Sequence, residues 1–596
     1  MVEIRDFRNI HHMLMEIVDR LPDRAAYRWI LDSGEVRSIT WEEFHDDVRR
    51  VAKSLIALGV NKGDKVNILS YTRYQWVLVD VAMASIGSCA VGIYQSLLAH
   101  DVGYIVDHSD AVLVFAEDED QLSKLLSIRE KIPAVRKLIL FTGEPPADNW
   151  VIGFDDFVAL GGQVPDDVLD ARIADVTPDD IATIVYTSGT TGVPKGAVLT
   201  HDNITFTAQS VFASTQILDG DETLLFLPLA HIFARTLVFC ALVSGCTTTF
   251  ARGLDTIAED FKIARPHWFP SVPRIYEKVY SKIVSGAEAK GGAALKIFRW
   301  ACRVGDRVSD LKLARKAIPP LTKLQYAIAT KLVFSKVQAA LGGRVRWCIS
   351  GAAPINPSIA KFFHGAGVLI VEGIGMTENT SFTNLNRFDD YRFGWVGPTG
   401  PGIEQKTAND GEVLYRGRNV MKEYYKMPVE TAETLTPDGW QHTGDLGEID
   451  AEGFLRITGR KKDLIITAGG KNIAPSAIEG LLATSKYISQ VCVIGDRRPY
   501  LTALITVDGD NIRDFAGENG IPGKSIKELI EDPRINRLIE AEVQAKNADL
   551  ASYETIKTFR LLEEFTIENG LLTPTMKVKR NVALERFGPL VEEMYV

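Results

Sequence analysis

The sequence predicts an α/β fold, and the order of its apolar runs is the main reason. Short β-branched runs such as "KVNILS", "AVLVFA" and "GVLIVEG" alternate with helical stretches through most of the chain. This alternation indicates parallel or mixed sheets covered by helices on both faces. After about Gly411 the pattern changes to short antiparallel strands, "GEVLYR" and "LGEIDAEGFLRITGR", with turn residues at Asp450–Gly453. We therefore expect a large N-terminal body of mixed or parallel sheets with a β-rich subdomain.

The last part of the chain has the composition of a separate small domain. Beyond "GRKKD" the strand-like runs "QVCVIGD" and "TALITVD" occur among helical stretches. The block is long enough to form its own core, because domains start at about 50 residues. We place the boundary near Lys462, with the body over residues 1–461 and a small α+β domain over residues 462–596.

Composition limits the classes of function. The 596 residues are 46% hydrophobic and 24% charged, which is typical of a globular protein. The net charge of −10 argues against a general nucleic-acid-binding protein. Six cysteines lack the spacing of a zinc site or a disulfide framework, so we expect a protein of the reducing cytoplasm. They are Cys89, Cys240, Cys246, Cys302, Cys348 and Cys492.

Neither export nor membrane insertion is expected from the apolar segments. The N-terminus carries both signs of charge and lacks an uninterrupted apolar core, so it is no ordinary secretory signal. The longest apolar stretch, Trp76–Tyr94, is long enough to span a bilayer but contains Asp80, Gly87 and Gly92. We expect a helix, a turn at Gly87 and a buried strand "CAVGIY" there.

A glycine-rich loop points to phosphate chemistry. The stretch "YTSGTTGVPKG", Tyr186–Gly196, holds three glycines, four Ser or Thr hydroxyls and one lysine directly after an apolar run. Glycines let the backbone amides approach an anion closely, and the hydroxyls add donors. The common nucleotide loop G-x-x-x-x-G-K-[ST] does not fit, because Lys195 is followed by Gly196. A polyphosphate cradle is the favoured interpretation, and a polar surface turn is the alternative.

Further motifs follow this loop in a fixed order. They are "SGAAP" (Ser350–Pro354), "EGIGMTE" (Glu372–Glu378), "GWQHTGDLG" (Gly439–Gly447), "GRKKDLIITAGGKNIAP" (Gly459–Pro475) and "LTPTMKVKR" (Leu572–Arg580). With the glycine-rich loop, they resemble the acyl-adenylate-forming superfamily in order and approximate spacing over essentially the whole chain. Within it, "LPLAHIFAR", "SVPRIYEK" and "TPTMKVKR" look like long-chain fatty-acid–CoA ligases of the bacterial FadD type.

The resemblance implies ATP-dependent activation of a long-chain fatty acid to acyl-CoA through acyl-AMP, with release of pyrophosphate and AMP. The implied cofactors and substrates are ATP, Mg²⁺, coenzyme A and the fatty acid. One alternative is a ligase that delivers acyl-AMP to a carrier protein, and another is a catalytically silent lipid-binding scaffold. A silent scaffold would be expected to lack some of the residues needed for chemistry. Those residues are all present: Lys195, Glu378, Asp445 and Lys577.

The resemblance also implies a set of site residues. The implied catalytic residues are Lys577, Lys195, Glu378 and His231, and Glu378 with Thr187 would hold Mg²⁺. The implied cofactor-binding residues are Thr187, Ser188, Gly189, Thr190, Thr191, Gly192, Lys195, Gly351, Ala352, Ala353, Gly375, Met376, Thr377, Asp445, Arg460, Lys462, Gly469 and Gly470. Structural alternatives stay open for three of them, because Glu378 could start a helix, Asp445 could form a turn and His231 could be a core histidine.

The small domain is implied to be a mobile lid with two poses. In one pose Lys577 reaches the reacting oxygens, and in the other the lid opens a path for CoA. Lys462 matches the hinge between the poses, and Gly469 and Gly470 would let the backbone pass close to CoA. The chain departs from the family at Ile374, where an aromatic residue usually stacks on adenine, so aliphatic packing replaces stacking.

One segment has an unusual charge. Residues 296–346 contain 12 Lys or Arg against Asp306 and Asp310, a charge of +10 in a chain whose total is −10. Apolar residues interleave at roughly helical spacing, which is typical of basic amphipathic helices. Peripheral contact with an anionic membrane at its inner, cytoplasmic face is one interpretation. The other is a solvated helical surface balanced by acidic residues from elsewhere in the chain.

Overall fold

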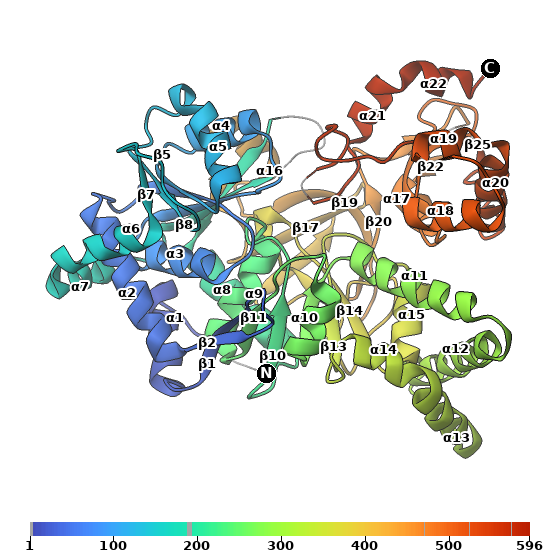
Figure 1. Ribbon diagram of the computed structural model, residues 1–596, viewed down its shortest axis with the longest axis horizontal. Coiled ribbons are helices and arrows are strands. Elements are labelled where there is room, and N and C mark those ends of the chain that lie inside the picture. The colour runs from blue at the N-terminus through green and yellow to red at the C-terminus, as the bar shows by residue number, and fades with distance from the viewer. Residues whose placement is uncertain (1–3, 188–192, 470, 524, 574) are drawn as a thin grey trace.

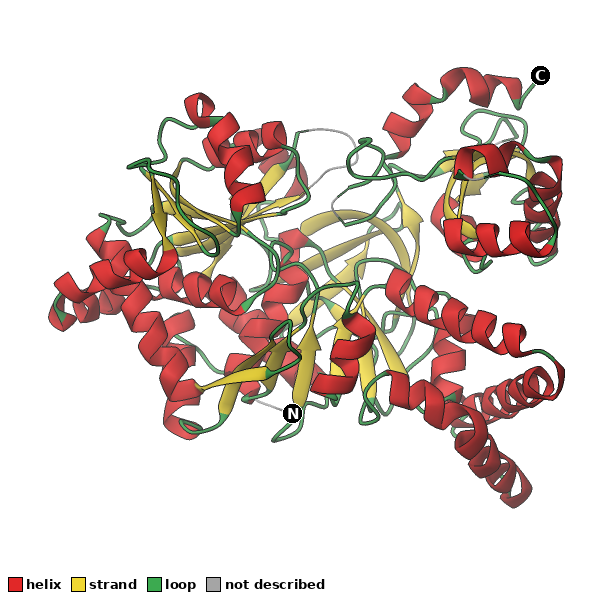
Figure 2. Cartoon of the chain, viewed as in Figure 1, coloured by secondary structure: helices red, strands yellow, loops and turns green. Residues whose placement is uncertain are grey.

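The computed structural model describes residues 4–187, 193–469, 471–523, 525–573 and 575–596. Figure 1 shows a large body, coloured blue to yellow, and a separate C-terminal domain, coloured orange to red, above its right-hand side. Figure 2 shows that helices cover the strands of both parts. The predicted α/β class is therefore confirmed, and the mobility of the C-terminal domain stays a prediction.

The first sheet of the body has eight strands, in the order β18-β9-β8-β4-β3-β5-β6-β7. Its strands are β3 (Lys65–Leu69), β4 (Cys89–Ile93), β5 (Ala111–Ala116), β6 (Lys137–Leu140), β7 (Val151–Gly153), β8 (Ile181–Thr187), β9 (Lys195–Thr200) and β18 (Glu423–Tyr424). Neighbouring strands from β8 through β4, β3, β5 and β6 to β7 are parallel. Strand β9 is antiparallel to both of its neighbours, β8 and β18. Every residue of β4 is buried, as expected for a parallel strand covered on both faces.

The second sheet also has eight strands, in the order β15-β14-β13-β12-β10-β11-β1-β2. Its strands are β1 (Ala25–Ile30), β2 (Val36–Thr40), β10 (Glu222–Leu225), β11 (Thr247–Phe250), β12 (Trp268–Ser271), β13 (Trp347–Ser350), β14 (Leu369–Ile374) and β15 (Asn384–Leu385). Its central strands are parallel, and antiparallel β2 and β15 close the two edges. The mixed sheets agree with the sequence prediction.

Helices pack on both sheets and between them. Those of the body are α1 (Ile10–Arg20), α2 (Trp41–Ala57), α3 (Tyr74–Ser85), α4 (Ala99–His108), α5 (Glu119–Ser127), α6 (Phe154–Leu160), α7 (Asp166–Asp175), α8 (His201–Ser214), α9 (Ile232–Ser244), α10 (Ile257–Ala264), α11 (Pro273–Lys290), α12 (Gly292–Leu313), α13 (Pro320–Ala329), α14 (Ser335–Ala340), α15 (Pro357–Gly365) and α16 (Pro428–Thr434). A π-helical stretch, Thr330–Phe334, joins α13 to α14. Three of these helices form a central layer with few exposed residues: α3, α8 and α9.

The change of pattern near Gly411 marks a four-stranded antiparallel sheet. It contains β16 (Ile403–Thr407), β17 (Glu412–Gly417), β19 (Gln441–Ile449) and β20 (Leu455–Arg460). The hairpin between β19 and β20 turns at the predicted residues, where the Asp450 carboxylate accepts from the amides of Glu452 and Phe454. The β-rich subdomain predicted from the sequence is therefore present.

The C-terminal domain has its own apolar core. Strands β23 (Ile488–Ile494), β24 (Leu501–Val507) and β25 (Ile556–Leu562) form its sheet, and β21 (Ile465–Ile466) pairs with β22 (Asn472–Ile473). Its helices are α17 (Pro475–Leu482), α18 (Gly509–Glu518), α19 (Ile526–Glu531), α20 (Pro533–Asn547), α21 (Arg580–Arg586) and α22 (Gly588–Glu593). The domain rests on α11 of the body, where Arg274 donates to Ser489 Oγ at 2.8 Å and Lys486 pairs with Glu288 at 2.8 Å.

The long apolar stretch folds as predicted. It forms α3, a turn in which Gly87 has φ +71°, and the buried strand β4. Asp80 is tolerated inside α3 because Arg235 of α9 binds its carboxylate through two nitrogens, at 3.1 and 2.5 Å. Within the described ranges, no helix combines the length and the hydropathy needed to cross a bilayer.

Candidate active site

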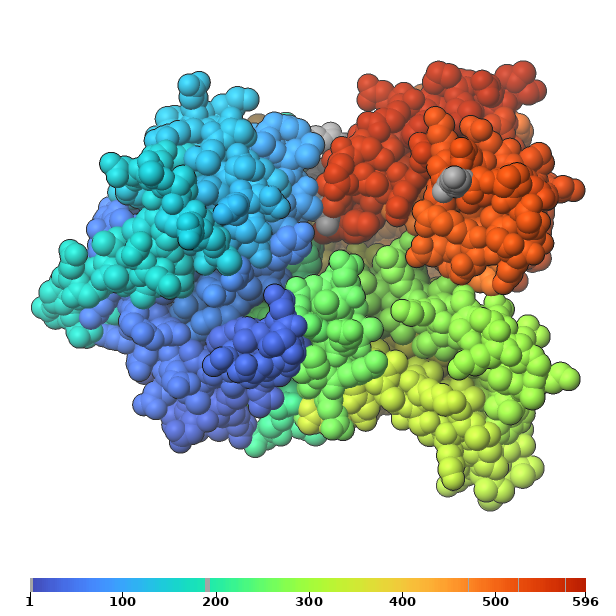
Figure 3. All heavy atoms as spheres, viewed as in Figure 1, coloured from blue at the N-terminus to red at the C-terminus, as the bar shows by residue number. Residues whose placement is uncertain are grey.

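A cavity of about 1190 Å³ lies between the body and the C-terminal domain. In the space-filling view the two parts are separated by a groove beneath the orange and red domain (Figure 3). The cavity lining comes from β8 and β9, the start of α9, the loops after β13 and β14, the end of β20, and the loop that precedes α21. The glycine-rich loop and the five ordered motifs that follow it all contribute residues, although the described part of "TAGGKN" lies outside the lining.

The two antiparallel strands that flank the glycine-rich loop contribute residues to the cavity lining. Thr187 ends β8 and pairs in register with Lys195, which begins β9, and both line the cavity. Gly196 is needed for close packing, because a Cβ atom there would lie 2.7 Å from Ile184 Cγ2. The predicted loop residues Ser188, Gly189, Thr190, Thr191 and Gly192 lie outside the described residues. The strands thus fix both ends of the predicted phosphate cradle.

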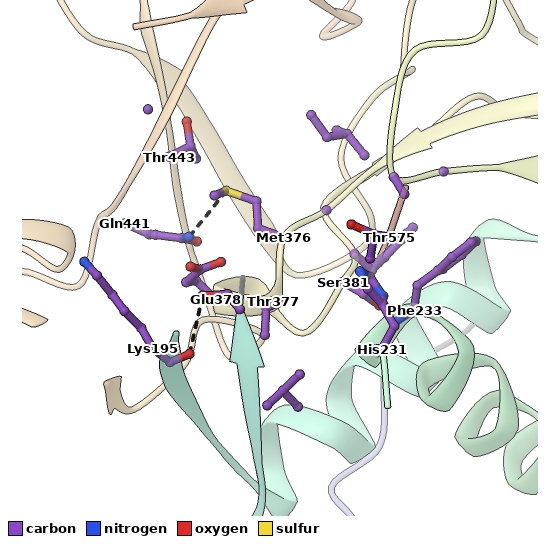
Figure 4. Close-up of a pocket in the computed structure, with 18 of the residues that line it drawn as sticks. Lys195, His231, Phe233, Met376, Thr377, Glu378, Ser381, Gln441, Thr443 and Thr575 are labelled. Carbon is purple, nitrogen blue, oxygen red and sulfur yellow. Dashed lines mark hydrogen bonds between the residues drawn. The ribbon is translucent and has the colours of Figure 1, made fainter. Parts of the chain in front are cut away.

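A tight turn after β14 presents Glu378 to the cavity. Gly375 lies so close to the chain that a Cβ atom there would be 2.1 Å from the carbonyl carbon of Ser381. The Asn379 side chain accepts a 2.6 Å bond from the Met376 amide, and Thr380 takes the left-handed φ of +55°. Strained backbone of this kind occurs mainly where surrounding contacts hold a functional side chain in place. Figure 4 shows Met376, Thr377 and Glu378 in this turn, with Lys195 nearby.

Glu378 has one neighbour that the sequence did not reveal. The Tyr424 hydroxyl, from β18, donates a 2.6 Å hydrogen bond to Glu378 Oε1, and the Lys195 ammonium lies 5.1 Å from the centre of the Tyr424 ring. Among the described residues there is no group of three His, Cys, Asp or Glu side chains that could hold a metal. Glu378 and the Thr187 hydroxyl nevertheless fit Mg²⁺, because this ion takes few protein oxygens and fills its shell with phosphate and water.

The β19–β20 hairpin supplies a second group of charges. Asp445 and Arg460 face each other across the two strands, and Arg460 Nε donates to Asp445 Oδ1 at 2.6 Å. Arg460 lines the cavity, whereas buried Asp445 lies behind it. The carboxylate of Glu412 in β17 links the two strands of this hairpin. It accepts from the Gly444 amide in β19 at 2.8 Å and from the Lys461 ammonium, just after β20, at 3.0 Å.

Lys577 reaches the cavity from the C-terminal domain. Two backbone hydrogen bonds hold the residues around it: the Thr573 amide donates to the Lys577 carbonyl at 2.8 Å, and the Lys579 amide donates to the Leu571 carbonyl. Partial loss of hydration beside the cavity lowers the pKa of Lys577 below its ordinary value, and neighbouring Arg460 lowers it further. The side chain remains exposed to solvent, and a lysine that lines a cavity with a shifted pKa is a candidate for a functional cation.

His231 lines the cavity at the start of α9. Its Nδ1 accepts a 3.1 Å bond from the Phe233 amide, so it caps the helix. Burial, with a smaller effect from the charge of Lys577, lowers the pKa of His231 to about 4. The ring is therefore neutral at physiological pH. Because Nδ1 accepts, the proton sits on Nε2 and can be donated to an anion in the cavity.

Family models divide the chain into two matched regions. A model described as "AMP-binding enzyme" matches residues 14–425, and one described as "AMP-binding enzyme C-terminal domain" matches residues 462–596. The chain belongs to the AMP-binding enzyme family. The resemblance predicted from the sequence motifs is therefore confirmed.

Relatives of this AMP-binding enzyme match it over nearly the full length. A protein named long-chain-fatty-acid–CoA ligase FadD15 of Mycobacterium tuberculosis is 36% identical over 98% of this chain and 97% of its own. A human protein named long-chain-fatty-acid–CoA ligase ACSBG2 is 30% identical over 94% of this chain and 88% of its own. The adenylation domain of a carboxylate reductase from Mycobacterium chelonae has the same fold, with a TM-score of 0.77, 22% identity, and coverage of 98% and 90%.

The structure brings most of the predicted site residues of this family member together. Those that line the cavity are Thr187, Lys195, His231, Gly351, Ala352, Gly375, Met376, Thr377, Glu378, Arg460, Lys462 and Lys577. Besides buried Asp445, two described residues lie outside the lining, and both are exposed: Ala353 and Gly469. Gly470 is outside the described residues. The sequence analysis missed Tyr424, Asn379 and Glu412, because nothing in the local sequence shows that these side chains fold onto the motifs.

Arg235 of α9 lies two residues beyond Phe233, which lines the cavity. Arg235 is 1% exposed, bound to Asp80, and its guanidinium lies 5.2 Å from the Trp76 ring. Its third contact is a 2.5 Å bond to Thr183 Oγ1. Arg235 is therefore a structural link between α3, α9 and β8, and Phe233 is the aromatic side chain of this helix turn that lines the cavity.

Proposed function

We propose that this AMP-binding enzyme is a long-chain fatty-acid–CoA ligase that works through acyl-AMP. The observation that carries the proposal is the meeting of Lys577 from one domain with Lys195, Glu378 and Arg460 from the other in one cavity. A fatty-acid carboxylate must approach the polyphosphate of ATP, and both are anions. Cations placed around the reacting oxygens lower the barrier by stabilising the charge that develops there.

Three side chains have proposed roles in adenylation. Lys577 would bind the oxygens that join the carboxylate to the α-phosphorus, and Lys195 would bind the outgoing pyrophosphate. Glu378 and the Thr187 hydroxyl would hold Mg²⁺, which supplies charge neutralisation to the phosphates when bound. The Lys195 ammonium lies 5.1 Å from the centre of the Tyr424 ring, and the hydroxyl of the same tyrosine binds Glu378.

The nucleoside would lie between the loops after β13 and β14 and the β19–β20 hairpin. Gly351 and Ala352 would contact one side of adenine, and Gly375, Met376 and Thr377 the other. Ile374 lines this part of the cavity, so the base would pack on an aliphatic side chain. Asp445 and Arg460 would bind the ribose, because the second carboxylate oxygen of Asp445 can accept from its hydroxyls.

The fatty acid would enter with its carboxylate toward His231. The Nε2 proton of the neutral ring can donate to the carboxylate and orient it toward the α-phosphorus. Apolar side chains from α8 and α9 form the wall beside it: Val211, Phe233 and Leu237. A wall of this type suits an alkyl chain, because burying each methylene contributes about 0.8 kcal/mol.

The second half-reaction would need the other pose of the C-terminal domain. In the present pose Gly469 is exposed and outside the cavity, whereas Lys577 lines it. Rotation about Lys462 would withdraw Lys577 and bring the loop of Gly469 and Gly470 to the path of CoA. The CoA thiolate would then attack the acyl carbonyl carbon, and AMP would leave with the bonding electrons of the acyl–oxygen bond.

Transfer of acyl-AMP to a carrier protein is the alternative. The deciding experiment measures pyrophosphate release from ATP across a series of fatty-acid lengths, followed by detection of acyl-CoA with free CoA. We expect release that rises with chain length and acyl-CoA as the product. Pyrophosphate release without acyl-CoA would favour the carrier-dependent ligase, and no release with any fatty acid would refute both.

We also place the enzyme in the cytoplasm with peripheral contact at the inner face of the membrane, because its proposed substrate partitions into bilayers. Part of the +10 segment is balanced as the alternative interpretation requires. Arg315 pairs with Asp390, Arg344 with Glu222 and Arg346 with Asp221, each at 2.5 Å. Four exposed cations on α12 form no ion pair with any residue that the structure describes: Lys296, Arg299, Arg303 and Arg307. They are the proposed electrostatic contact with anionic lipid.

A further inference from the structure

The helical run from α13 to α14 carries an unusual exposed apolar edge. Leu321 is 68% exposed, Leu324 60%, and Ile328 and Leu332 44% each. The spacing of three and four residues places the first three on one face of α13, and Leu332 follows one turn later in the π-helical stretch. We call these four residues the apolar edge. Single exposed leucines are common, whereas four in one stripe mark an interaction site.

The opposite face of the same helical segment packs on the body, so the apolar edge points away from it. Ala329, Phe334 and Val337 are buried in a core cluster with residues of α12 and α15. Contact between α12 and this run is close, because a Cβ atom on Gly305 would lie 2.9 Å from the Phe334 ring. In Figures 1 and 3, α13 projects beyond the rest of the body at the lower right. The edge is therefore a fixed protrusion.

Exposed lysines flank the apolar edge. They are Lys323, Lys331 and Lys336, and none of them forms an ion pair with another described residue. A leucine stripe bordered by lysines is the pattern of a helix that lies in the interface of an anionic bilayer. A symmetric contact between two copies of the chain would bring the same lysines face to face, and this repulsion disfavours it.

We propose that the apolar edge inserts into the headgroup region of an anionic membrane, with the three lysines on lipid phosphates. The proposal deepens the membrane contact proposed above and rests on it, because it supplies the insertion that the cations of α12 alone cannot provide. Salt should weaken only the lysine part of the interaction, since charge is screened over about 8 Å at physiological ionic strength. The apolar part should persist.

The test is flotation of the full-length protein with vesicles that contain phosphatidylglycerol and with vesicles of phosphatidylcholine alone. The variant Leu324→Ser/Ile328→Ser/Leu332→Ser keeps the charge and makes three of the four residues of the apolar edge polar, and we expect its partition coefficient to fall about tenfold. The partition coefficient of the variant Lys323→Gln/Lys331→Gln/Lys336→Gln should also fall. The binding that remains should depend less on salt concentration than that of the wild type. Leu218→Ser/Leu254→Ser is the matched control, because these leucines are 54% and 58% exposed elsewhere on the body.

Three outcomes would overturn the proposal. One is equal binding of the wild type to both kinds of vesicle or to neither, and another is unchanged binding of the serine variant. The third is a wild-type dimer in sedimentation velocity that becomes monomeric in the serine variant, which would assign the edge to a second copy. Pyrophosphate release with a water-soluble, medium-chain fatty acid should be unchanged in every variant. Absence of that release in the wild type would refute the proposed reaction and leave the flotation result intact.

Discussion

The Tyr424 hydroxyl donates a 2.6 Å hydrogen bond to Glu378 Oε1, across 46 residues of sequence. Burial, with the adjacent Glu378 carboxylate, raises the pKa of Tyr424 well above its ordinary value. The phenol therefore stays protonated and keeps donating at any physiological pH. One tyrosine thus fixes the proposed metal-binding carboxylate and places its ring against Lys195.

This contact predicts a positioning role for Tyr424. In Tyr424→Phe we expect kcat/KM for pyrophosphate release to fall about tenfold, because a hydrogen bond to a charged group contributes about 1.5–3 kcal/mol. The Mg²⁺ concentration for half-maximal rate should rise as well, which a purely structural residue would not cause. Tyr425→Phe is the control, since that hydroxyl binds Asp110 at the surface. Equal Mg²⁺ dependence in the two variants would refute the role.

Lys577 should matter in one half-reaction only. In Lys577→Ala we expect acyl-AMP formation to fall by about 10²–10³, the usual cost of losing one group that stabilises transition-state charge. Thioester formation from supplied acyl-AMP should largely survive, because the proposed second pose withdraws this side chain. The two half-reactions are measured separately by rapid quench. Equal losses in a folded variant would remove Lys577 from the proposed role.

Lys462 should matter in the other half-reaction. Proline fixes φ near −65°, so Lys462→Pro should block the rotation between poses while leaving the present pose accessible. We expect acyl-AMP to accumulate and acyl-CoA to form slowly. Lys462→Ala separates the loss of the side chain from the loss of rotation and should form acyl-CoA. Normal acyl-CoA output from the proline variant would place the hinge elsewhere.

His201 should make the protein sensitive to acid. This residue is fully buried at the start of α8, and burial lowers its pKa from 6.5 to about 4. The unfolded chain therefore binds a proton between these values that the folded chain does not, so stability is lost as the pH falls through this window. The loss approaches about 3 kcal/mol at the acid end.

Thermal unfolding midpoints between about pH 7 and about pH 5 measure this effect. In His201→Gln the midpoint should be lower at neutral pH, because the ring accepts from the Ile10 amide, but it should change less with pH. The exposed His100→Gln variant should keep the wild-type profile. An unchanged slope in His201→Gln would mean that other buried groups cause the acid sensitivity.

Much of the architecture follows from local sequence. The strands "KVNILS" and "AVLVFA" became β3 and β5, and the change of pattern near Gly411 became an antiparallel sheet. These predictions hold because the spacing of apolar residues and the presence of turn residues reflect the local preference of the backbone for helix, strand or turn. The sequence also indicated amphipathic helices in residues 296–346, but it could not show that Phe334 faces the core and Leu332 the solvent.

The sequence by itself determined the chemistry that each loop can offer. The glycines and hydroxyls of Tyr186–Gly196, with Lys195, indicated a loop able to bind an anion, because glycines allow close backbone approach and the hydroxyls add donors. Only the tertiary structure decided which groups meet. Tyr424 reaches Glu378, and Lys577 reaches the cavity of His231, because packing of distant strands and domains sets their distances. Long-range contacts depend on the whole core, and no local pattern encodes them.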